Sequence, residues 1–131
     1  MNRSYFKLAI ITLLSLMAIL SCTKSNESII SDEVKRIKSR LPAEMNQYTT
    51  WVDVRPATNE IIFVYEIKGV DQSLVTDKLI AESKSKAISG LRSQKNMEKY
   101  FKRNINLTCI YLDEDQNELM NMTITRNDLG Y

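Results

Sequence analysis

The sequence contains no histidine at all. Histidine is the side chain whose proton moves most readily near neutral pH, so its absence excludes Ser-His-Asp triads, histidine metal sites and most general-base mechanisms. Glycine is also scarce, with three residues, and no nucleophile motif is present. We therefore expect a protein that is not an enzyme, with no catalytic residues, no cofactor and no metal site.

A surplus of positive charge is missing as well. The chain has 18 Lys and Arg residues against 16 Asp and Glu residues, and the difference comes from Arg3 and Lys7 near the N-terminus. A nucleic-acid binder needs a standing excess of cations that displaces counterions from phosphates. The balanced remainder argues against a nucleic-acid partner and leaves a protein partner open.

The N-terminus combines a short cationic start with an apolar run. Residues 8–20 are apolar apart from two hydroxyl side chains and carry no charge. As a helix this run would be about 20 Å long, well short of a bilayer core near 30 Å. Its length is typical of a signal peptide and not of a stop-transfer helix. The run ends at Ile19-Leu20-Ser21-Cys22, with an aliphatic residue three positions before the cysteine and a small residue directly before it.

This order of segments resembles the type II signal peptide and lipobox of bacterial lipoproteins. The resemblance implies that residues 1–21 are a signal peptide and that Cys22 begins the mature protein, with a diacylglycerol on its sulfur and commonly an acyl chain such as palmitate on its amine. Acylation at both positions exceeds what durable membrane attachment requires. In the enterobacterial sorting rule, Asp after the cysteine retains a lipoprotein in the inner membrane. Thr23 stands there, which implies the outer membrane, facing the periplasm.

The alternative is an ordinary secreted protein in which Cys22 is a free thiol. A cleavage site of the A-x-A kind, typical of such proteins, is missing before the cysteine. After Cys22 the residues are polar, so we expect residues 22–29 to be the lipidated cysteine and a short tether. Residues 30–131 are then long enough for a single domain.

Alternating helical and strand periods predict the elements of this domain. Apolar residues spaced by four, three and four positions predict a helix at 32–41, with Ser31 as its N-cap. Strand-forming residues and turn clusters predict one hairpin from strands at 50–55 and 60–67, and a second from strands at 105–112 and 118–125. Helical spacing between the hairpins predicts helices at 72–93 and 96–103. The inward positions expected in the longer helix are Leu74, Ile80, Ala87, Ile88 and Leu91.

The element order α-β-β-α-β-β predicts an α+β fold. Hairpins joined through a helix give a two-layer domain, with an antiparallel sheet of two hairpins and helices packed on it.

Beyond the signal, the chain resembles a diffuse group of small uncharacterised bacterial envelope proteins. The residues that carry the resemblance are Leu41-Pro42, Phe63-Val64-Tyr65, the segment from Asn96 to Phe101, and the turn from Tyr111 to Asn117. The resemblance implies an α+β fold and an envelope location, without an activity. The group's cysteine before the short helix, and its partner near the C-terminus, have no counterpart around Ser93-Gln94 and Asp128-Leu129. A disulfide common to that group is therefore missing here.

Two further features have simple structural interpretations. The segment Asp113-Glu114-Asp115-Gln116-Asn117 begins like a calcium loop, but its sixth and twelfth positions hold Glu118 and Ile124 instead of Gly and Glu. An acidic hairpin turn remains as the interpretation. Cys109 lies within a predicted strand with no cationic neighbour in sequence to lower its pKa, so we expect a buried, inert thiol.

The strand at 60–67 is apolar on both of its faces, although a sheet with one solvated face should alternate. The favoured interpretation is a central strand covered on both sides by the two main helices. The other interpretation is a partner-binding face in which Phe63 and Tyr65 join Trp51 and Tyr111 from neighbouring strands. The sequence leaves open whether these four side chains share one face of the sheet.

Together these patterns predict a lipid-anchored periplasmic protein that acts by binding. The first hypothesis is a non-catalytic accessory module that docks an envelope or secretion-system component, in the manner of a pilotin. The second is an immunity or inhibitor lipoprotein that blocks a toxin or a hydrolase, and an enzyme is a distant third. The expected partners are the membrane, through the lipid on Cys22, and a protein.

Overall fold

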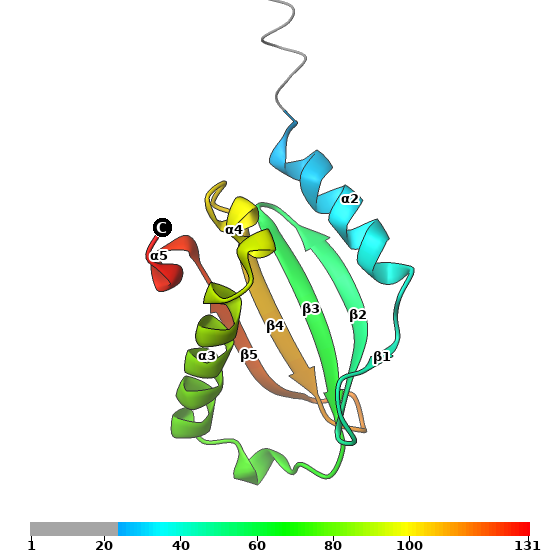
Figure 1. Ribbon diagram of the computed structural model, residues 1–131. Helices are drawn as coiled ribbons and strands as arrows, with labels where there is room; N and C mark the ends of the chain where they lie inside the picture. The colour runs from blue at the N-terminus through cyan, green and yellow to red at the C-terminus, as the bar shows by residue number, and fades with distance from the viewer. Residues whose placement is uncertain (1–23) are drawn as a thin grey trace, which may run out of the picture.

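A computed structural model describes residues 24–131 of the protein, so the predicted signal peptide and Cys22 lie outside the described residues. Four helices, one short 3-10 helix and a five-stranded sheet make up this part of the chain (Figure 1). The predicted α+β class is confirmed. Their order is α2 (Asn26–Lys38), β1 (Ala43–Glu44), β2 (Thr49–Ala57), β3 (Glu60–Ile67), η1 (Gln72–Leu74), α3 (Asp77–Arg92), α4 (Lys95–Phe101), β4 (Asn106–Leu112), β5 (Glu118–Ile124) and α5 (Arg126–Leu129). None of the helices in residues 24–131 has the length and apolar character needed to span a membrane.

The sheet is mixed, which corrects the prediction of a wholly antiparallel sheet. The strands lie in the order β1-β2-β3-β4-β5, and both predicted hairpins, β2–β3 and β4–β5, are present. Strands β3 and β4 at the centre pair in parallel, with Glu60 opposite Asn106. A parallel pair needs a crossover of a dozen or more residues. Helices α3 and α4 form that crossover and return the chain to the end of the sheet where β3 begins.

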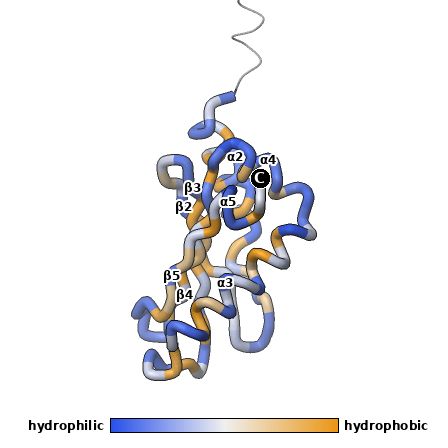
Figure 2. Tube along the Cα trace, turned by 90° about the vertical axis from the view of Figure 1, so that its left-hand side faces the viewer, coloured by the Kyte–Doolittle hydropathy of each residue, from blue (hydrophilic) through white to orange (hydrophobic). Residues whose placement is uncertain are grey.

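Helices α2 and α3 lie on the same face of the sheet, as the edge-on view in Figure 2 shows. The apolar stripe of α2, Ile30, Val34 and Ile37, is buried in a cluster with Val54 and Ile61. A second cluster under α3 contains Leu107, Cys109, Met122 and Ile124. Because Phe63 packs against both clusters, the two helices share one face. The favoured interpretation of β3, covered by helices on both sides, is therefore wrong.

Helix α2 begins earlier than the sequence analysis predicted. The Ser25 hydroxyl accepts a hydrogen bond from the backbone N–H of Ser28 at 3.2 Å and caps the helix. Ser31, the predicted N-cap, therefore lies inside the helix. Residues 26–29, predicted as tether, form its first turn, so the polar spacer after Cys22 is shorter than expected.

The segment predicted as one helix at 72–93 is divided in two. The Asp71 carboxylate caps the 3-10 turn η1, and the Thr76 hydroxyl caps α3 by accepting from the backbone N–H of Leu79 at 3.2 Å. Leu74, predicted to face inward, lies in η1 with 62% of its surface exposed. Ala87, Ile88 and Leu91 do pack against the core as predicted.

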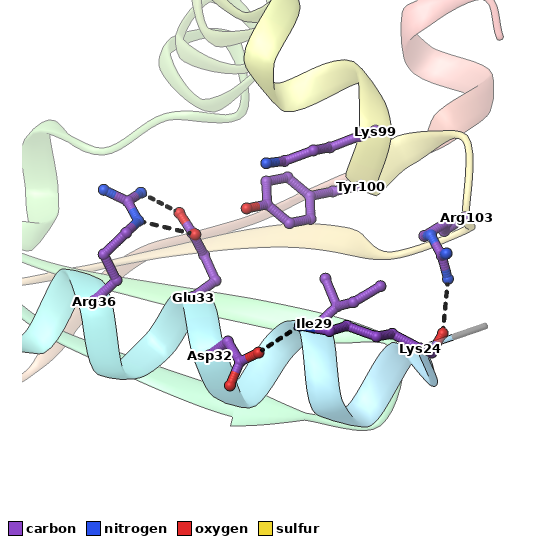
Figure 3. A pocket seen from close by; sticks show the side chains of 8 residues that line it. All are labelled: Lys24, Ile29, Asp32, Glu33, Arg36, Lys99, Tyr100 and Arg103. Atoms are coloured by element: carbon purple, nitrogen blue, oxygen red, sulfur yellow. Dashed lines mark hydrogen bonds and ion pairs between the residues drawn. The ribbon is translucent and has the colours of Figure 1, made fainter. Parts of the chain in front are cut away.

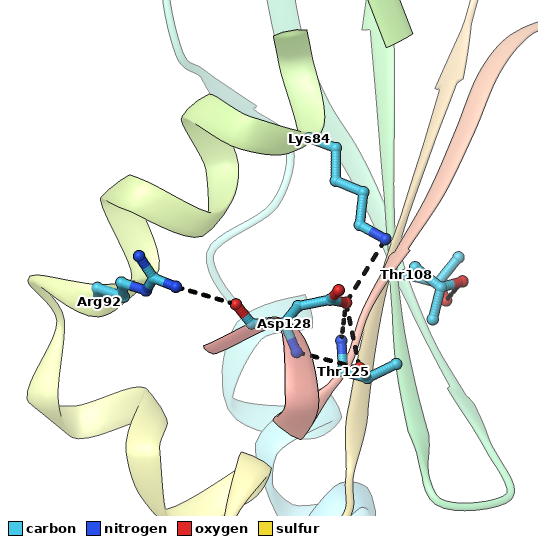
Figure 4. Close-up of polar contacts among 6 residues, drawn as sticks. Lys84, Arg92, Thr108, Thr125 and Asp128 are labelled. Carbon is cyan, nitrogen blue, oxygen red and sulfur yellow. Dashed lines mark hydrogen bonds and ion pairs between the residues drawn. The ribbon is translucent and has the colours of Figure 1, made fainter. Parts of the chain in front are cut away.

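Noncovalent contacts hold the C-terminal segment against α3, in the absence of the disulfide common to the group that the chain resembles (Figure 4). Asp128 and Thr125 cap helix α5 reciprocally, and Asp128 also forms an ion pair with Lys84 of α3 at 3.5 Å. The Arg92 guanidinium donates to the backbone carbonyl of Asp128 at 3.2 Å. Leu129 is buried in the core. Polar contacts to α3 thus take the place of the covalent link.

Candidate functional site

Four aromatic side chains meet on the helix-covered face of the sheet. Trp51 on β2, Tyr65 on β3 and Tyr111 on β4 are directly opposite one another in the strand register. The rings of Tyr65 and Tyr111 are stacked, with their centroids 5.0 Å apart. The ring centroids of Trp51 and Phe63 are 4.5 Å apart. Trp51 and Tyr65 stack at 5.9 Å. The structure thus brings together all four residues predicted from the sequence, and we call them the aromatic floor.

A β-bulge sets the position of Trp51 at the edge of this floor. The register of β2 against β3 shifts between Trp51 and Asp53, which places both Trp51 and Val54 on the core face. The Trp51 indole N–H donates to the backbone carbonyl of Asp53 at 3.0 Å, and Arg55 Nε donates to the Asp53 carboxylate at 2.9 Å. A bulge re-aims side chains in this way without ending the strand pairing.

The aromatic floor lies in a groove of about 550 Å³. One wall comes from α2 and the loop after it, with Ile37 and Leu41, and the opposite wall from α3, with Ala87 and Leu91. Gly90 of α3 also lines the groove, and a Cβ atom added there would meet no other atom within 4 Å. The floor residues are half-buried, so they are neither sealed in the core nor fully in water. A groove of this kind suits an apolar segment of a partner.

The rim of the groove on the α2 side is charged. Arg36 pairs with Glu33 through two contacts, one of them from Nε to Oε2 at 3.1 Å. The hydrogen bond from Arg36 lowers the pKa of Glu33, which keeps the carboxylate charged. Arg40 is exposed at the same rim and forms no ion pair within residues 24–131. The rim therefore presents one cation whose charge is not neutralised.

Burial in the groove keeps the ionisable side chains of Cys109, Tyr65 and Tyr111 in their neutral forms. Burial raises the pKa of the Cys109 thiol to about 12 and that of Tyr111 to about 12, and it raises the pKa of Tyr65 as well. Cys109 is 5% exposed, which confirms that it is buried. Neutral, desolvated groups of this kind favour binding of apolar surface over proton transfer.

The acidic turn at 113–117 satisfies its own hydrogen bonds. The Asp113 carboxylate accepts from the backbone N–H groups of Asp115 and Asn117 at 2.9 and 2.8 Å. These bonds lower the pKa of Asp113, the one from Asn117 most strongly. The predicted hairpin turn is confirmed by the pairing of β4 with β5.

A second, smaller pocket of about 400 Å³ lies between α2 and α4 and shares Glu33 and Arg36 with the groove (Figure 3). Its lining is largely charged. The residues are Lys24, Ile29, Asp32, Glu33, Arg36, Lys99, Tyr100 and Arg103. This pocket was not predictable from local sequence pattern, because its residues come from segments far apart in the chain.

Ala87 and Leu91 were predicted to face inward, but not to form one wall of a groove. Ala87, Gly90 and Leu91 follow the i, i+3, i+4 spacing of one helix face, and that spacing is a usable signal. A small residue at the centre of such a face marks a place where something else can approach the helix. This spacing alone does not show that α2 lies on the opposite side of the groove from α3.

Comparison with known proteins gives structural matches only. No protein-family model and no curated protein matches the sequence. The pilotin EpsS of the type 2 secretion system of Vibrio vulnificus superposes with a TM-score of 0.67 and 10% identity, over 81% of this chain and 93% of that one. The type II secretion system pilotin AspS of Vibrio cholerae gives 0.61 and 10%, over 79% and 91%. A candidate secreted protein of Pseudomonas aeruginosa gives 0.62 and 9%, over 82% and 98%. At these identities the chain shares its fold with two pilotins and one further bacterial protein.

Proposed function

We propose that the protein is a lipid-anchored accessory protein of the bacterial envelope that binds a protein component of a secretion system and catalyses no reaction. The observation that carries the proposal is the aromatic floor, four contiguous rings at the base of an open groove. The fold shared with two pilotins supports the class of partner. The resemblance of Ile19-Leu20-Ser21-Cys22 to a lipobox supports the lipid anchor, and Thr23 in place of Asp after the cysteine supports an outer-membrane site facing the periplasm.

The groove is suited to one kind of occupant. Its floor and walls are apolar, and the unneutralised charge at its rim is the cation Arg40. Charge complementarity therefore favours an amphipathic segment that places apolar side chains on the floor and a carboxylate beside Arg40. Aromatic residues in a desolvated pocket are the usual centres of binding energy, so most of the affinity is expected from Trp51, Tyr65 and Tyr111.

The proposal can be tested by photo-crosslinking in membranes. A photoreactive amino acid replaces Met45, which lines the groove and is 56% exposed. The matched control replaces Leu74, which is 62% exposed and lies outside the groove. We expect a discrete adduct from position 45 and not from position 74, and mass spectrometry should identify the adduct as a secretion-system component.

Two other results would count against the proposal. Equal adducts from both positions would mean that the groove is not the docking site. An adduct with a toxin or a hydrolase would favour the inhibitor alternative, which no observation on residues 24–131 currently supports over the accessory role.

A further inference from the structure

The first residues that the structure describes are fastened to the folded domain. Arg103 Nη1 donates a hydrogen bond to the backbone carbonyl of Lys24 at 3.1 Å (Figure 3). Asn26 Nδ2 donates to the backbone carbonyl of Arg103 at 3.0 Å and to the side-chain oxygen of Asn59 at 3.1 Å. The loop after α4 and the turn between β2 and β3 therefore hold the start of α2 in place.

These hydrogen bonds lie very close in sequence to the predicted site of lipid attachment. Lys24 is two positions after Cys22 in the sequence. Two residues of extended chain span at most about 7 Å. A lipid on Cys22 would thus hold this end of the domain beside the headgroups, whereas a long tether would let the domain turn freely.

The same end of the domain carries exposed cations. Lys24, Lys99 and Arg103 line the pocket between α2 and α4. Lys102 follows α4 directly, and the half-buried Arg126 lies next to it because its guanidinium donates to the Lys102 backbone carbonyl at 3.1 Å.

Carboxylates at this end do not cancel the positive charge. Four carboxylates at this end are each paired with a cation: Asp32 with Lys24 at 3.5 Å, Glu98 with Lys102, Glu33 with Arg36, and Asp128 with Lys84 at 3.5 Å. Glu27 lies in the first turn of α2, and Glu60 at the start of β3 accepts a hydrogen bond from the Thr108 hydroxyl. Neither Lys99 nor Arg103 forms an ion pair within the described part of the chain. We call this surface the basic end, defined by Lys24, Lys99, Lys102, Arg103 and Arg126.

The opposite end of the sheet is acidic. The β4–β5 turn contains Asp113, Glu114 and Asp115, and the cap of η1 and the first turn of α3 add Asp71 and Asp77. Lys68 and Lys78 are the cations nearby in sequence. Figure 1 shows that the β4–β5 turn and η1 lie at the far end of the strands from the start of α2. The domain therefore has a charge gradient along its length.

We propose that the basic end rests on the anionic lipid headgroups of the membrane, with the strands directed away from it and the acidic end outermost. The inference rests on the proposed lipid anchor at Cys22 and adds an orientation to it. Cations next to a membrane surface are attracted by its anionic lipids, and this attraction acts within about 10 Å at moderate salt. The hydrogen bond from Arg103 to the Lys24 backbone carbonyl keeps the basic end inside that range.

The test uses the full-length, processed protein reconstituted into phosphatidylcholine vesicles with and without phosphatidylglycerol. A fluorophore is attached to a new cysteine, either Thr58→Cys in the β2–β3 turn or Glu114→Cys in the β4–β5 turn; both positions are exposed. Cys109 does not compete for the label because it is buried and its pKa is raised to about 12. Lipids with a nitroxide on the headgroup then quench the fluorophore on contact.

We expect several-fold stronger quenching at position 58 than at position 114 in vesicles that contain phosphatidylglycerol. The contrast should weaken in neutral vesicles, at high salt, and in the double variant Lys99→Gln/Lys102→Gln. The matched control is Lys68→Gln/Lys78→Gln at the acidic end, which should leave the contrast unchanged. Arg103→Ala should also reduce the contrast, because it removes the guanidinium that holds the Lys24 carbonyl and takes one cation from the basic end, while the hydrogen bonds of Asn26 remain.

The outcomes separate the two proposals. Protein that does not float with the vesicles would contradict the lipid anchor and the orientation together. Protein that floats but is quenched equally at the two positions would overturn the orientation alone. A contrast that survives the basic-end variants as well as the control variant would show that the cations do not set the orientation, and would overturn the inference.

Discussion

A substitution that adds a side chain at Gly90 distinguishes an effect on partner binding from an effect on folding stability better than the removal of an aromatic residue does. Gly90 is helical, has no strained backbone angle, and faces open space where a Cβ would meet nothing within 4 Å. Replacing a helical glycine by alanine stabilises a protein by about 0.5–1 kcal/mol, and leucine has nearly the same helix propensity as alanine. We therefore expect Gly90→Ala and Gly90→Leu to raise the melting temperature by about 2–8 °C.

The two variants should differ in binding. The added methyl group of Gly90→Ala is small against a groove of about 550 Å³, whereas a leucine side chain would occupy more of the open space at the wall that Gly90 lines. A loss of about 1.4 kcal/mol in binding free energy equals a tenfold loss of affinity. With the photoreactive residue at position 45, Gly90→Leu should reduce the adduct by about this factor. Gly90→Ala should leave it unchanged.

The readouts are circular dichroism during heating and quantification of the adduct. A stable Gly90→Leu variant that still forms the full adduct would refute the groove as the docking site. A lower melting temperature for Gly90→Ala would instead show that the space beside Gly90 is occupied and that this wall of the groove is not open there.

Three further predictions concern the proposed lipid anchor at Cys22, the aromatic floor, and the contacts of Asp128 that hold the C-terminal segment. Cys22→Ala should move the protein from the membrane fraction to the soluble fraction, and continued recovery with membranes would contradict the anchor. Tyr65→Ala should lower the free energy of unfolding by about 2–3 kcal/mol and abolish the adduct, while Tyr65→Phe keeps the ring and should change stability by less than about 1 kcal/mol in denaturant titrations. Hydrogen bonds from Thr125 lower the pKa of Asp128, so its contribution to stability is present above the ordinary carboxylate pKa near 3.9 and is lost as pH falls through the lower folded-state value. Asp128→Asn should therefore lower the melting temperature at pH 7 and have little effect near pH 2, and an equal effect at both pH values would contradict this account.

Local pattern was sufficient to predict the hairpins. Both turns are formed by residues that tolerate or favour turn conformations, with positive φ at Asn59 and Gln116. The alternation of Phe63 and Tyr65 along β3 also placed these rings on one face, because side chains in a strand repeat every second residue. Trp51 and Tyr111 joined that face through the register, which the sequence alone left open.

The parallel pairing of β3 with β4 was not predictable in the same way. Periodicity shows that both strands are apolar, but it does not identify their neighbours. The incorrect prediction that helices cover both faces of the sheet followed from the same lack of information about strand neighbours. The apolar outer face of β3 suggested a covering helix, yet Val64 is 1% exposed on the face opposite to the helices, where its strand partners are Asp53 and Ile110. Neighbouring side chains of the sheet can bury a central residue without a second layer.

The parallel central pair also affects how the chain acquires its structure. Glu60 finds its partner Asn106 only after the whole crossover through α3 and α4 has been made. Until then one edge of β3 has open backbone hydrogen-bonding groups and an apolar surface, a combination that promotes association between chains. Contacts between segments so distant in sequence also slow folding. A newly made chain is therefore most at risk of aggregation in the interval before its last two strands emerge, and a holding chaperone would be of greatest use in that interval.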